Sequence, residues 1–426
     1  MPMEFPEEFR KLPPEQKRVF WESFIDTDER SIALANDEQF NLADILVEHA
    51  VGICAVPLGL ASGFLIDGKK YIIPLAVEEP SVIAAAGYGA HIIAQGGGFT
   101  THAEPSITES YIYIEHADRG AMEKINKEQL ANILAPVLAR LEKRGGGLCG
   151  IQTYLLPETK LIAVELSIDV CDAMGANIVN TAAEAARPYL ESVTGGNVLM
   201  CILSNASIHR KAFAEFFLPF EQLTPYCKGF SAQETARRIV LATDLANEDP
   251  HRAVTHNKGI MNGIASLALA TMNDTRAIEA AAHAWSLRGG KIVSLSQFSI
   301  DGDALHGKLE LPLAFGTVGG SIDLHPGAQS ALRILGNPDS RMLARIAVAV
   351  GLAQNFSALL ALVTSGIQRG HMKYHAARIA YKAGARGATA RMIGEKLAQE
   401  KNYSVERARE LLQQSDLKDR EFKEKS

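Results

Sequence analysis

Residues 110–203 alternate between two hydrophobic periods, and this alternation limits the fold more than any other feature of the chain. A two-residue period or a short apolar run predicts a strand, and a period near 3.6 predicts a helix. Strands are expected at 111–114, 151–156, 161–170 and 198–203, and helices at 122–141 and 176–190. Their order is β-α-β-β-α-β, the split ferredoxin-like arrangement. We therefore expect residues 109–215 to form a small domain inserted into a larger one.

The remaining chain predicts a mostly helical larger domain in two parts, residues 1–108 and 216–373, so that the class is α+β. Residues 1–36 are polar and proline-broken, which is typical of an arm. Helical patterns fill the chain from the end of the small domain to about residue 290, and a strand pair is expected at 291–300 and 307–313. Asp67 and Gly68 are a hairpin signal. Residues 374–426 form a short, charged segment with helical patterns, which predicts a C-terminal helical flap.

Composition excludes several classes of protein. Hydrophobic residues make up 47% of the 426 residues, and the formal net charge is −6. This balance supports large buried cores and argues against a general nucleic-acid surface. The five cysteines show no CxxC or Cys/His metal spacing, which argues against a metal site or a disulfide framework and favours reduced thiols in the cytoplasm. The apolar run 346–363 is interrupted by Gln354 and Asn355, so we expect no membrane span.

A long apolar helix is predicted within residues 255–274, with Lys258 near one end and Asp274 at the other. Polar helix ends are common, so this pattern alone can be purely structural. The two residues cannot share a site along one straight helix, because at about 1.5 Å per residue they stand roughly 24 Å apart. Either the segment bends near Gly263, or two subunits assemble the site.

Three other segments carry polar groups that chemistry can use, each with a simpler alternative. Glu78-Glu79-Pro80-Ser81 precedes a helix, where acidic residues are favoured anyway. The segment DAMGAN, residues 172–177, lies at a strand-to-helix junction, where the free N–H groups of a helix can bind phosphate or Asp172 can simply cap the helix. His371 follows Arg369 and Gly370, and a lone histidine is more often structural than catalytic.

The glycines of RGGGLCG fit the GxGxxG spacing of a dinucleotide-binding turn, but their context is reversed. In that motif a strand precedes the glycines and a helix follows them, whereas here the expected helix comes first. A glycine-rich turn is enough to explain Gly145, Gly147 and Gly150.

Together the segments THNKGIMNGI, EEPS, DAMGAN and GHM resemble those of the class II HMG-CoA reductases, over about residues 40–415. The segments GLAQNF and GTVGG also match, while His49 replaces the asparagine usual in the family's ENVIG segment. The resemblance implies roles for the following residues. Catalysis is assigned to Glu79, Lys258, Asp274 and His371; substrate binding to Ser81, Arg252, Asn262 and Gln354; and cofactor binding to Gly150, Asp172, Ala173, Met174, Gly175 and Asn177.

The implied reaction reduces a thioester to an alcohol by two hydride transfers from NADH or NADPH. Lys258 would stabilise the oxyanion, and His371 would protonate the CoA thiolate. Glu79 would donate a proton to the aldehyde oxygen if burial raises its pKa, and Asp274 would join Lys258 and Glu79 in one network. The expected partners are HMG-CoA, mevalonate and CoA, in a homodimer or an assembly of dimers, for mevalonate synthesis or catabolism.

Two alternatives remain at this point: another acyl-CoA or 3-hydroxyacyl-CoA dehydrogenase, and a catalytically silent CoA-binding protein. The choice of cofactor is a separate expectation. Gly150 stands where relatives often carry an aspartate, which would repel the 2′-phosphate of NADPH. Its absence predicts relaxed discrimination between NADH and NADPH.

Overall fold

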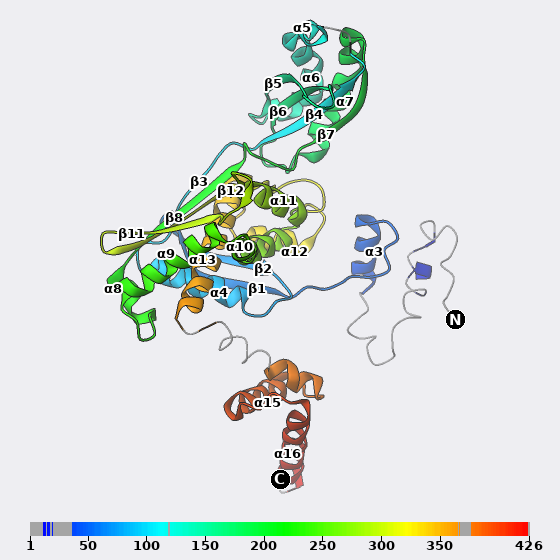
Figure 1. Ribbon diagram of the computed structural model, residues 1–426. Coiled ribbons are helices and arrows are strands. Elements are labelled where there is room, and N and C mark those ends of the chain that lie inside the picture. The colour runs from blue at the N-terminus through cyan, green and yellow to red at the C-terminus, as the bar shows by residue number, and fades with distance from the viewer. Residues whose placement is uncertain are drawn as a thin grey trace.

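The computed structural model describes residues 36–117, 120–364, 366 and 376–424, together with 12, 13, 15–17 and 19, and the side chains of these residues up to 415. Its described part contains three separate hydrophobic cores. Figure 1 shows a large central body, a small unit at its upper end and a group of helices below. Helices are combined with small antiparallel sheets, which confirms the α+β class.

The small unit is one antiparallel sheet covered by helices. Its strands stand in the order β5-β6-β4-β7, the order of a ferredoxin-like sheet. The strands are β4 Ile107–Glu115, β5 Gly147–Leu155, β6 Ile162–Asp169 and β7 Asn197–Leu203, and the helices are α5 Ala121–Lys124, α6 Lys127–Glu142 and α7 Ala176–Thr194. Apolar side chains of α6 and α7 pack on one face of the sheet and form its core. The β-α-β-β-α-β order expected from hydrophobic periodicity is therefore confirmed.

The central body combines a hairpin and a second four-stranded sheet with long helices. The hairpin joins β1 Leu58–Ile66 to β2 Lys69–Ala76 through the expected Asp67-Gly68 turn. The sheet has the order β11-β12-β8-β3, with β11 Ser296–Asp301, β12 Ala304–Pro312, β8 Lys211–Pro219 and β3 Thr100–Ala103. The helices are α4 Val82–Ala94, α8 Phe220–Leu223, η2 Thr224–Tyr226, α9 Ala232–Glu248, α10 Pro250–Ala270, α11 Thr275–Ser286, α12 Pro326–Ile334 and α13 Ser340–Val363, and a two-residue hairpin joins β9 Leu287–Arg288 to β10 Lys291–Ile292.

The prediction that helical patterns continue from the small domain to residue 290 was wrong for residues 211–219. These residues form β8, which pairs with both β12 and β3 in the middle of the large sheet. Every second residue, Ala212, Ala214, Phe216 and Leu218, is buried. This two-residue period was present in the sequence and indicates a strand that is half buried. The expected borders at 108/109 and 215/216 fall inside β4 and β8.

Helix α13 runs through the core of the central body. It is the one described helix that is long and apolar enough to cross a membrane, and 83% of its most apolar window is buried inside the protein. It packs against α4 and α10. A buried core helix meets the same length and composition criteria as a membrane span, so its apolar character follows from its place in the core.

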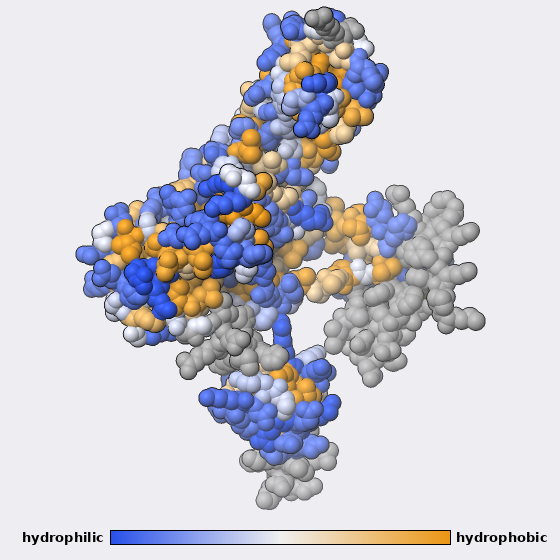
Figure 2. All heavy atoms as spheres, in the orientation of Figure 1, coloured by the Kyte–Doolittle hydropathy of each residue, from blue (hydrophilic) through white to orange (hydrophobic). Residues whose placement is uncertain are grey.

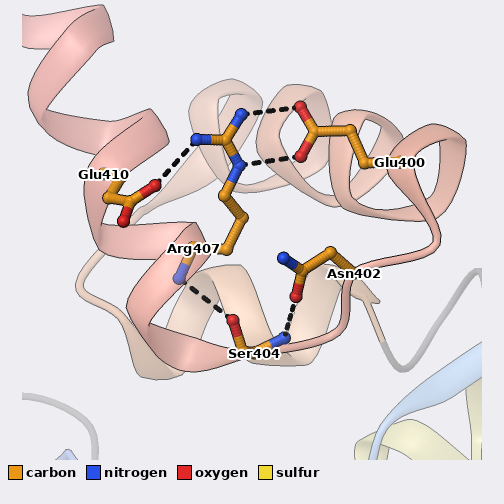
Figure 3. A network of polar contacts seen from close by, with 5 residues as sticks. All are labelled: Glu400, Asn402, Ser404, Arg407 and Glu410. Carbon is orange, nitrogen blue, oxygen red and sulfur yellow. Dashed lines mark hydrogen bonds and ion pairs between the residues drawn. The ribbon is translucent and has the colours of Figure 1, made fainter.

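The C-terminal helices have a small core of their own. Residues 376–382 are helical, followed by α15 Gly387–Glu400 and α16 Val405–Glu424. Figure 3 shows how Arg407 joins them: its guanidinium donates two bonds to Glu400, of 2.7 and 2.8 Å, and one of 2.7 Å to Glu410. These bonds raise the pKa of Arg407 and lower that of Glu400.

Candidate active site

Helix α10 places Lys258 beside Glu79. The helix begins at Pro250, where the side chain of Asp249 accepts a bond from His251 N at 2.9 Å. Glu79 lies in the segment that leads from β2 to α4, and its Oε2 accepts a bond of 2.8 Å from Lys258 Nζ. The side chain of Lys258 is 59% exposed and that of Glu79 is 38% exposed. The burial expected for Glu79 is therefore not found in the single chain. The pair is an ion pair at the protein surface.

A cavity of about 650 Å³ opens beside this ion pair, between α4, α10 and α13. All four predicted substrate residues line it: Ser81, Arg252, Asn262 and Gln354. Two of them present buried polar atoms that have no hydrogen-bond partner in the described structure, Ser81 Oγ and Gln354 Oε1. Buried polar groups are normally hydrogen-bonded, so these atoms indicate a polar ligand in the cavity.

The backbone of Ser81 supports the same interpretation. Ser81 caps α4 with a φ of 74°, in the left-handed region, and its side chain makes no capping bond. A serine at a helix N-cap normally accepts such a bond, and a left-handed conformation is strained for a residue with a side chain. Strain of this kind is common where a side chain must point at a ligand.

A second cavity, of about 300 Å³, lies on the other side of the ion pair. Glu79, Lys258 and Asn262 line both cavities. The second cavity continues along α10 toward Leu269 and Thr275. The ion pair therefore stands between two spaces, and one of them leads along the helix surface toward its far end.

The structure does not bring Asp274 to Lys258 within one chain. Helix α10 is continuous through Gly263, and about 18 Å of helix separates Lys258 from Ala270 at ~1.5 Å per residue. Gly263 instead allows close packing, because a Cβ there would come within 2.9 Å of Val350 on α13. Asp274 begins α11, where its Oδ1 accepts bonds from Arg276 N and Ala277 N, both of 3.1 Å. The helix is therefore not broken at Gly263, where one of the two options left open placed a bend.

The six predicted cofactor residues all belong to the small unit. Residues 172–177 join β6 to α7, and Gly175 is the N-cap of α7 with a φ of 100°. Asp172 does not cap α7, as the simpler alternative proposed; its Oδ1 accepts a 2.9 Å bond from Ser340 N at the start of α13. Helix α7 has no side-chain capping bond, which leaves its N-terminal N–H groups available to an anion.

Gly150 lies on β5, opposite Ser167 of β6. A Cβ built on Gly150 would meet the Ser167 side chain at 3.9 Å, an ordinary contact distance. The position therefore has room for a larger side chain such as aspartate.

His256, Ser296 and Asn355 form a buried polar cluster behind the larger cavity, and it was not predicted from the sequence. His256 Nε2 lies 2.7 Å from Ser296 Oγ, which in turn donates a bond of 2.8 Å to Asn355 Oδ1. Burial and the positive charge of Arg252 lower the pKa of His256 to about 3, so the imidazole is neutral. His256 and Asn355 adjoin Lys258 and Gln354 in the same short segments, and this adjacency was the available signal.

His371, the fourth predicted catalytic residue, lies outside the described residues. The helical segment that follows it packs near the site, because Arg378 Nη2 donates a 3.2 Å bond to Glu78 O. A cavity of about 890 Å³ separates this segment and α15 from α4, with Arg378, Arg391, Glu79 and Ser81 in its lining.

The chain is similar to known proteins over most of its length. The sequence profile described as Hydroxymethylglutaryl-coenzyme A reductase matches residues 13–376. The 3-hydroxy-3-methylglutaryl-coenzyme A reductase of Archaeoglobus fulgidus is 39% identical over 417 residues, which are 95% of this chain and 93% of that protein. A probable reductase of the same name from Borreliella burgdorferi is 33% identical over 88% of this chain and 87% of its own length. The class II 3-hydroxy-3-methylglutaryl-CoA reductase from Streptococcus pneumoniae, bound to NADPH in open conformations, has a TM-score of 0.74 and 36% identity, covering 95% of this chain and 100% of that one.

Proposed function

The chain belongs to the hydroxymethylglutaryl-coenzyme A reductase family, and we propose that Glu79, Lys258 and Asp274 carry its reaction at a site that two copies of the chain assemble. It is an oxidoreductase of class II that interconverts HMG-CoA and mevalonate plus CoA. NADH or NADPH supplies the hydride. Family membership sets aside the alternative of another acyl-CoA dehydrogenase.

The Lys258–Glu79 ion pair at the mouth of the larger cavity is the observation that supports these roles most strongly. A cation here can stabilise the oxyanion that forms when a thioester carbonyl accepts hydride. Glu79, in contact with that cation, is in position to exchange a proton with the same oxygen in the second reduction. Ser81, Asn262 and Gln354 would hold the polar substrate, with Arg252 facing its carboxylate.

We propose that Asp274 reaches the ion pair from a second copy of the chain, in a homodimer or an assembly of dimers. One chain keeps Asp274 at the far end of α10, and the ion pair is open to solvent. Apolar side chains support the dimer. Helix α3, Asp37–Leu46, precedes β1 and stands apart from the central body (Figure 1). Four apolar side chains from the end of α3 to the start of β1 are 54–73% exposed: Ile45, Val47, Leu58 and Leu60. Figure 2 shows hydrophobic side chains gathered on α3 and its connection to the body. A partner that covers them would also cover the site.

For the cofactor, we propose that residues 172–177 and the N-terminus of α7 bind the pyrophosphate, with Gly150 near the ribose. The uncapped α7 N-terminus fits an anion, and the open space at Gly150 fits a cofactor with or without a 2′-phosphate. We propose that NADPH is therefore accepted as well as NADH.

For the remainder of the chain, we propose that His371 protonates the CoA thiolate and that residues 374–426 close over the site. The cavity between α4 and α15 supports closure, because it leaves the ion pair open on that side. We further propose domain borders in the connections at 104–106 and 204–210, between the strands of the two sheets. A cytoplasmic location is proposed because α13 is buried in the core and the five cysteines are free thiols.

The test of these roles is the reduction of HMG-CoA by Lys258→Ala, followed through the absorbance of the reduced cofactor. Loss of the oxyanion donor is expected to lower kcat by about 10²–10³-fold. Lys143→Ala, at the exposed end of α6, is the matched control and is expected to leave kcat unchanged. Near-normal kcat in a folded Lys258→Ala variant would remove Lys258 from the mechanism, and an inactive wild-type chain would indicate the catalytically silent alternative.

A further inference from the structure

Residues 172–177, proposed above to bind the cofactor, are called the cofactor loop. Residues 315–318, which we call the strap, lie between this loop and the segment that carries Asp274. On one side the strap binds residues 172–174: Thr317 N donates a 2.8 Å bond to Asp172 O, and Val318 forms a parallel bridge with Ala173. Gly316 lies directly against this loop, because a Cβ there would come within 2.5 Å of Met174 N. The strap and the cofactor loop are therefore in direct backbone contact.

On its other side the strap is held by the side chain of Asn273. Asn273 Nδ2 donates a 3.0 Å bond to Gly316 O, and Gly316 N donates a 2.7 Å bond back to Asn273 Oδ1. The amide thus pairs with the strap as a neighbouring strand would. Asn273 is 8% exposed and directly precedes Asp274.

The backbone between α10 and Asp274 is also fixed. Met272 has a φ of 53°, and Asn273 N donates a 2.8 Å bond to Ala268 O across the end of the helix. A left-handed residue other than glycine persists only where its surroundings determine the conformation. The pairing of Asn273 with the strap is one such determinant, so a shift of the strap would be transmitted to the start of α11.

A buried arginine completes the contact. Arg210 is 4% exposed and donates bonds to Met174 O at 2.9 Å, Ala173 O at 3.5 Å and Phe315 O at 2.6 Å, and a fourth of 3.2 Å to Thr108 Oγ1. Burial lowers the pKa of its guanidinium to about 10, opposed by Asp169 and Glu109, so it is charged at neutral pH. Burying a cation is costly, and here the charge is used to hold the carbonyls of the cofactor loop and of the strap together.

We propose that Arg210 and Asn273 are positioning residues that couple cofactor binding to the placement of Asp274 in the same chain. The cofactor loop, the strap and the start of α11 form one contiguous hydrogen-bonded unit. Ordering of the loop by the cofactor fixes the strap, and the strap fixes the residue before Asp274. By linkage, loosening Asn273 must weaken cofactor binding although its side chain lies on the far side of the strap. This inference rests on the proposed roles of Asp274 and of residues 172–177.

The first experiment measures the Kd for NADPH of Asn273→Ala by quenching of intrinsic fluorescence, with no substrate present. An increase of about fivefold to tenfold is expected, within the usual range of coupling between sites. Asn257→Ala is the matched control: Asn257 makes the same two-way contact with Val293 O and Leu295 N, of 2.8 and 3.0 Å, but on a segment away from the cofactor loop. It is expected to lose similar thermal stability with no change in Kd. Equal Kd values for Asn273→Ala and the wild type would overturn the coupling.

The second experiment uses Arg210→Lys, which keeps the charge but cannot span the carbonyls of Met174 and Phe315 together. Both a higher Kd for NADPH and a lower kcat at saturating NADPH are expected, because the strap and Asp274 shift with the loop. A higher Kd with an unchanged kcat would show a clamp on the loop alone and contradict the coupling. If Asn273→Ala does not fold, Asn273→Ser and Arg210→Lys supply the same readouts. The Kd does not depend on turnover, so an inactive wild-type chain would refute the proposed function and leave the Kd test intact.

Discussion

The two ends of α10 are built in opposite ways. At the substrate end, Lys258 and Glu79 form an ion pair whose side chains are 59% and 38% exposed, beside two cavities. At the strap end, Asn273 is 8% exposed and is bonded in both directions to Gly316, and Asp274 caps α11. The substrate end holds unpartnered polar atoms beside open cavities, whereas at the strap end Asn273 is buried and bonded in both directions.

This contrast indicates a division of labour between subunits. The substrate end has what a bound thioester needs, but Asp274 of the same chain lies beyond the far end of α10. The strap end holds Asp274 at the start of α11, across the strap from the cofactor loop, and Lys258 lies at the opposite end of α10. In the proposed dimer each end supplies half of a site, and bringing opposite ends together would complete two sites. The hydride donor and Asp274 would then come from one chain, and Lys258, Glu79 and most substrate contacts from the other.

Alanine substitutions at one glycine from each end give the largest expected difference in stability. Gly316→Ala places a Cβ within 2.5 Å of Met174 N, so backbone must move, and a loss of about 3 kcal/mol in the free energy of unfolding is expected. Gly259→Ala, one residue after Lys258, meets no atom within 4 Å and is expected to gain up to about 1 kcal/mol, since alanine is the better helix former. Urea unfolding measures both. Equal effects would show that the two ends are packed alike.

Acid is expected to destabilise the chain through His256 at the substrate end, with a slightly smaller effect. The pKa of His256 is about 3 in the folded chain and near 6.5 unfolded, so only the unfolded chain takes up this proton between these values. The contribution of neutral His256 to the free energy of unfolding is complete above pH 6.5. It decreases as the pH falls toward 3, and the loss is roughly 2 kcal/mol at pH 5. Arg210, the buried group near the strap, stays charged over this range.

The measurement is urea unfolding of the wild type and of His256→Gln at pH 7.5 and pH 5. Glutamine keeps a donor for Ser296 but does not titrate, so the variant is expected to lose less stability on acidification. An identical loss in both proteins would show that His256 does not carry the effect.

Much of this arrangement could be predicted from the sequence, because local patterns carried it. The period of residues 110–203 predicted the β-α-β-β-α-β order of the small unit, and the family resemblance singled out Ser81, Arg252, Asn262 and Gln354, which all line one cavity. Strand β8 was missed because its alternation of Ala212, Ala214, Phe216 and Leu218 was read within a longer helical stretch. Glu79 was expected to be buried and is 38% exposed in the single chain, because burial depends on how distant segments pack and not on the residues around Glu79.

The strap shows a different limit. The roles proposed for Arg210 and Asn273 depend on contacts between distant parts of the chain. Arg210 bonds to Phe315, 105 positions away, and Asn273 bonds to Gly316, 43 positions away. No local period or motif carries such information. Helix rise needs only the sequence spacing of Lys258 and Asp274, and it left a bend or a second subunit as ways to join them; α10 is continuous through Gly263.

The assembly of the site from two chains is tested most directly by mixed dimers. Lys258→Ala and Asp274→Ala chains carrying different affinity tags are expressed together, and the hybrid is purified through both tags. If Lys258 and Asp274 of one site come from different chains, the hybrid contains one site with both native residues. It is expected to show about half the wild-type activity, whereas each variant alone is nearly inactive.

The hybrid of Lys258→Ala with Glu79→Gln is the control. Lys258 and Glu79 are bonded within one chain, so each of its sites carries one substitution and no activity should return. Recovery in the first hybrid and none in the second is the result that this account predicts. No recovery in the first hybrid, in a dimer shown to be intact, would mean that one chain supplies both Lys258 and Asp274 and would contradict it.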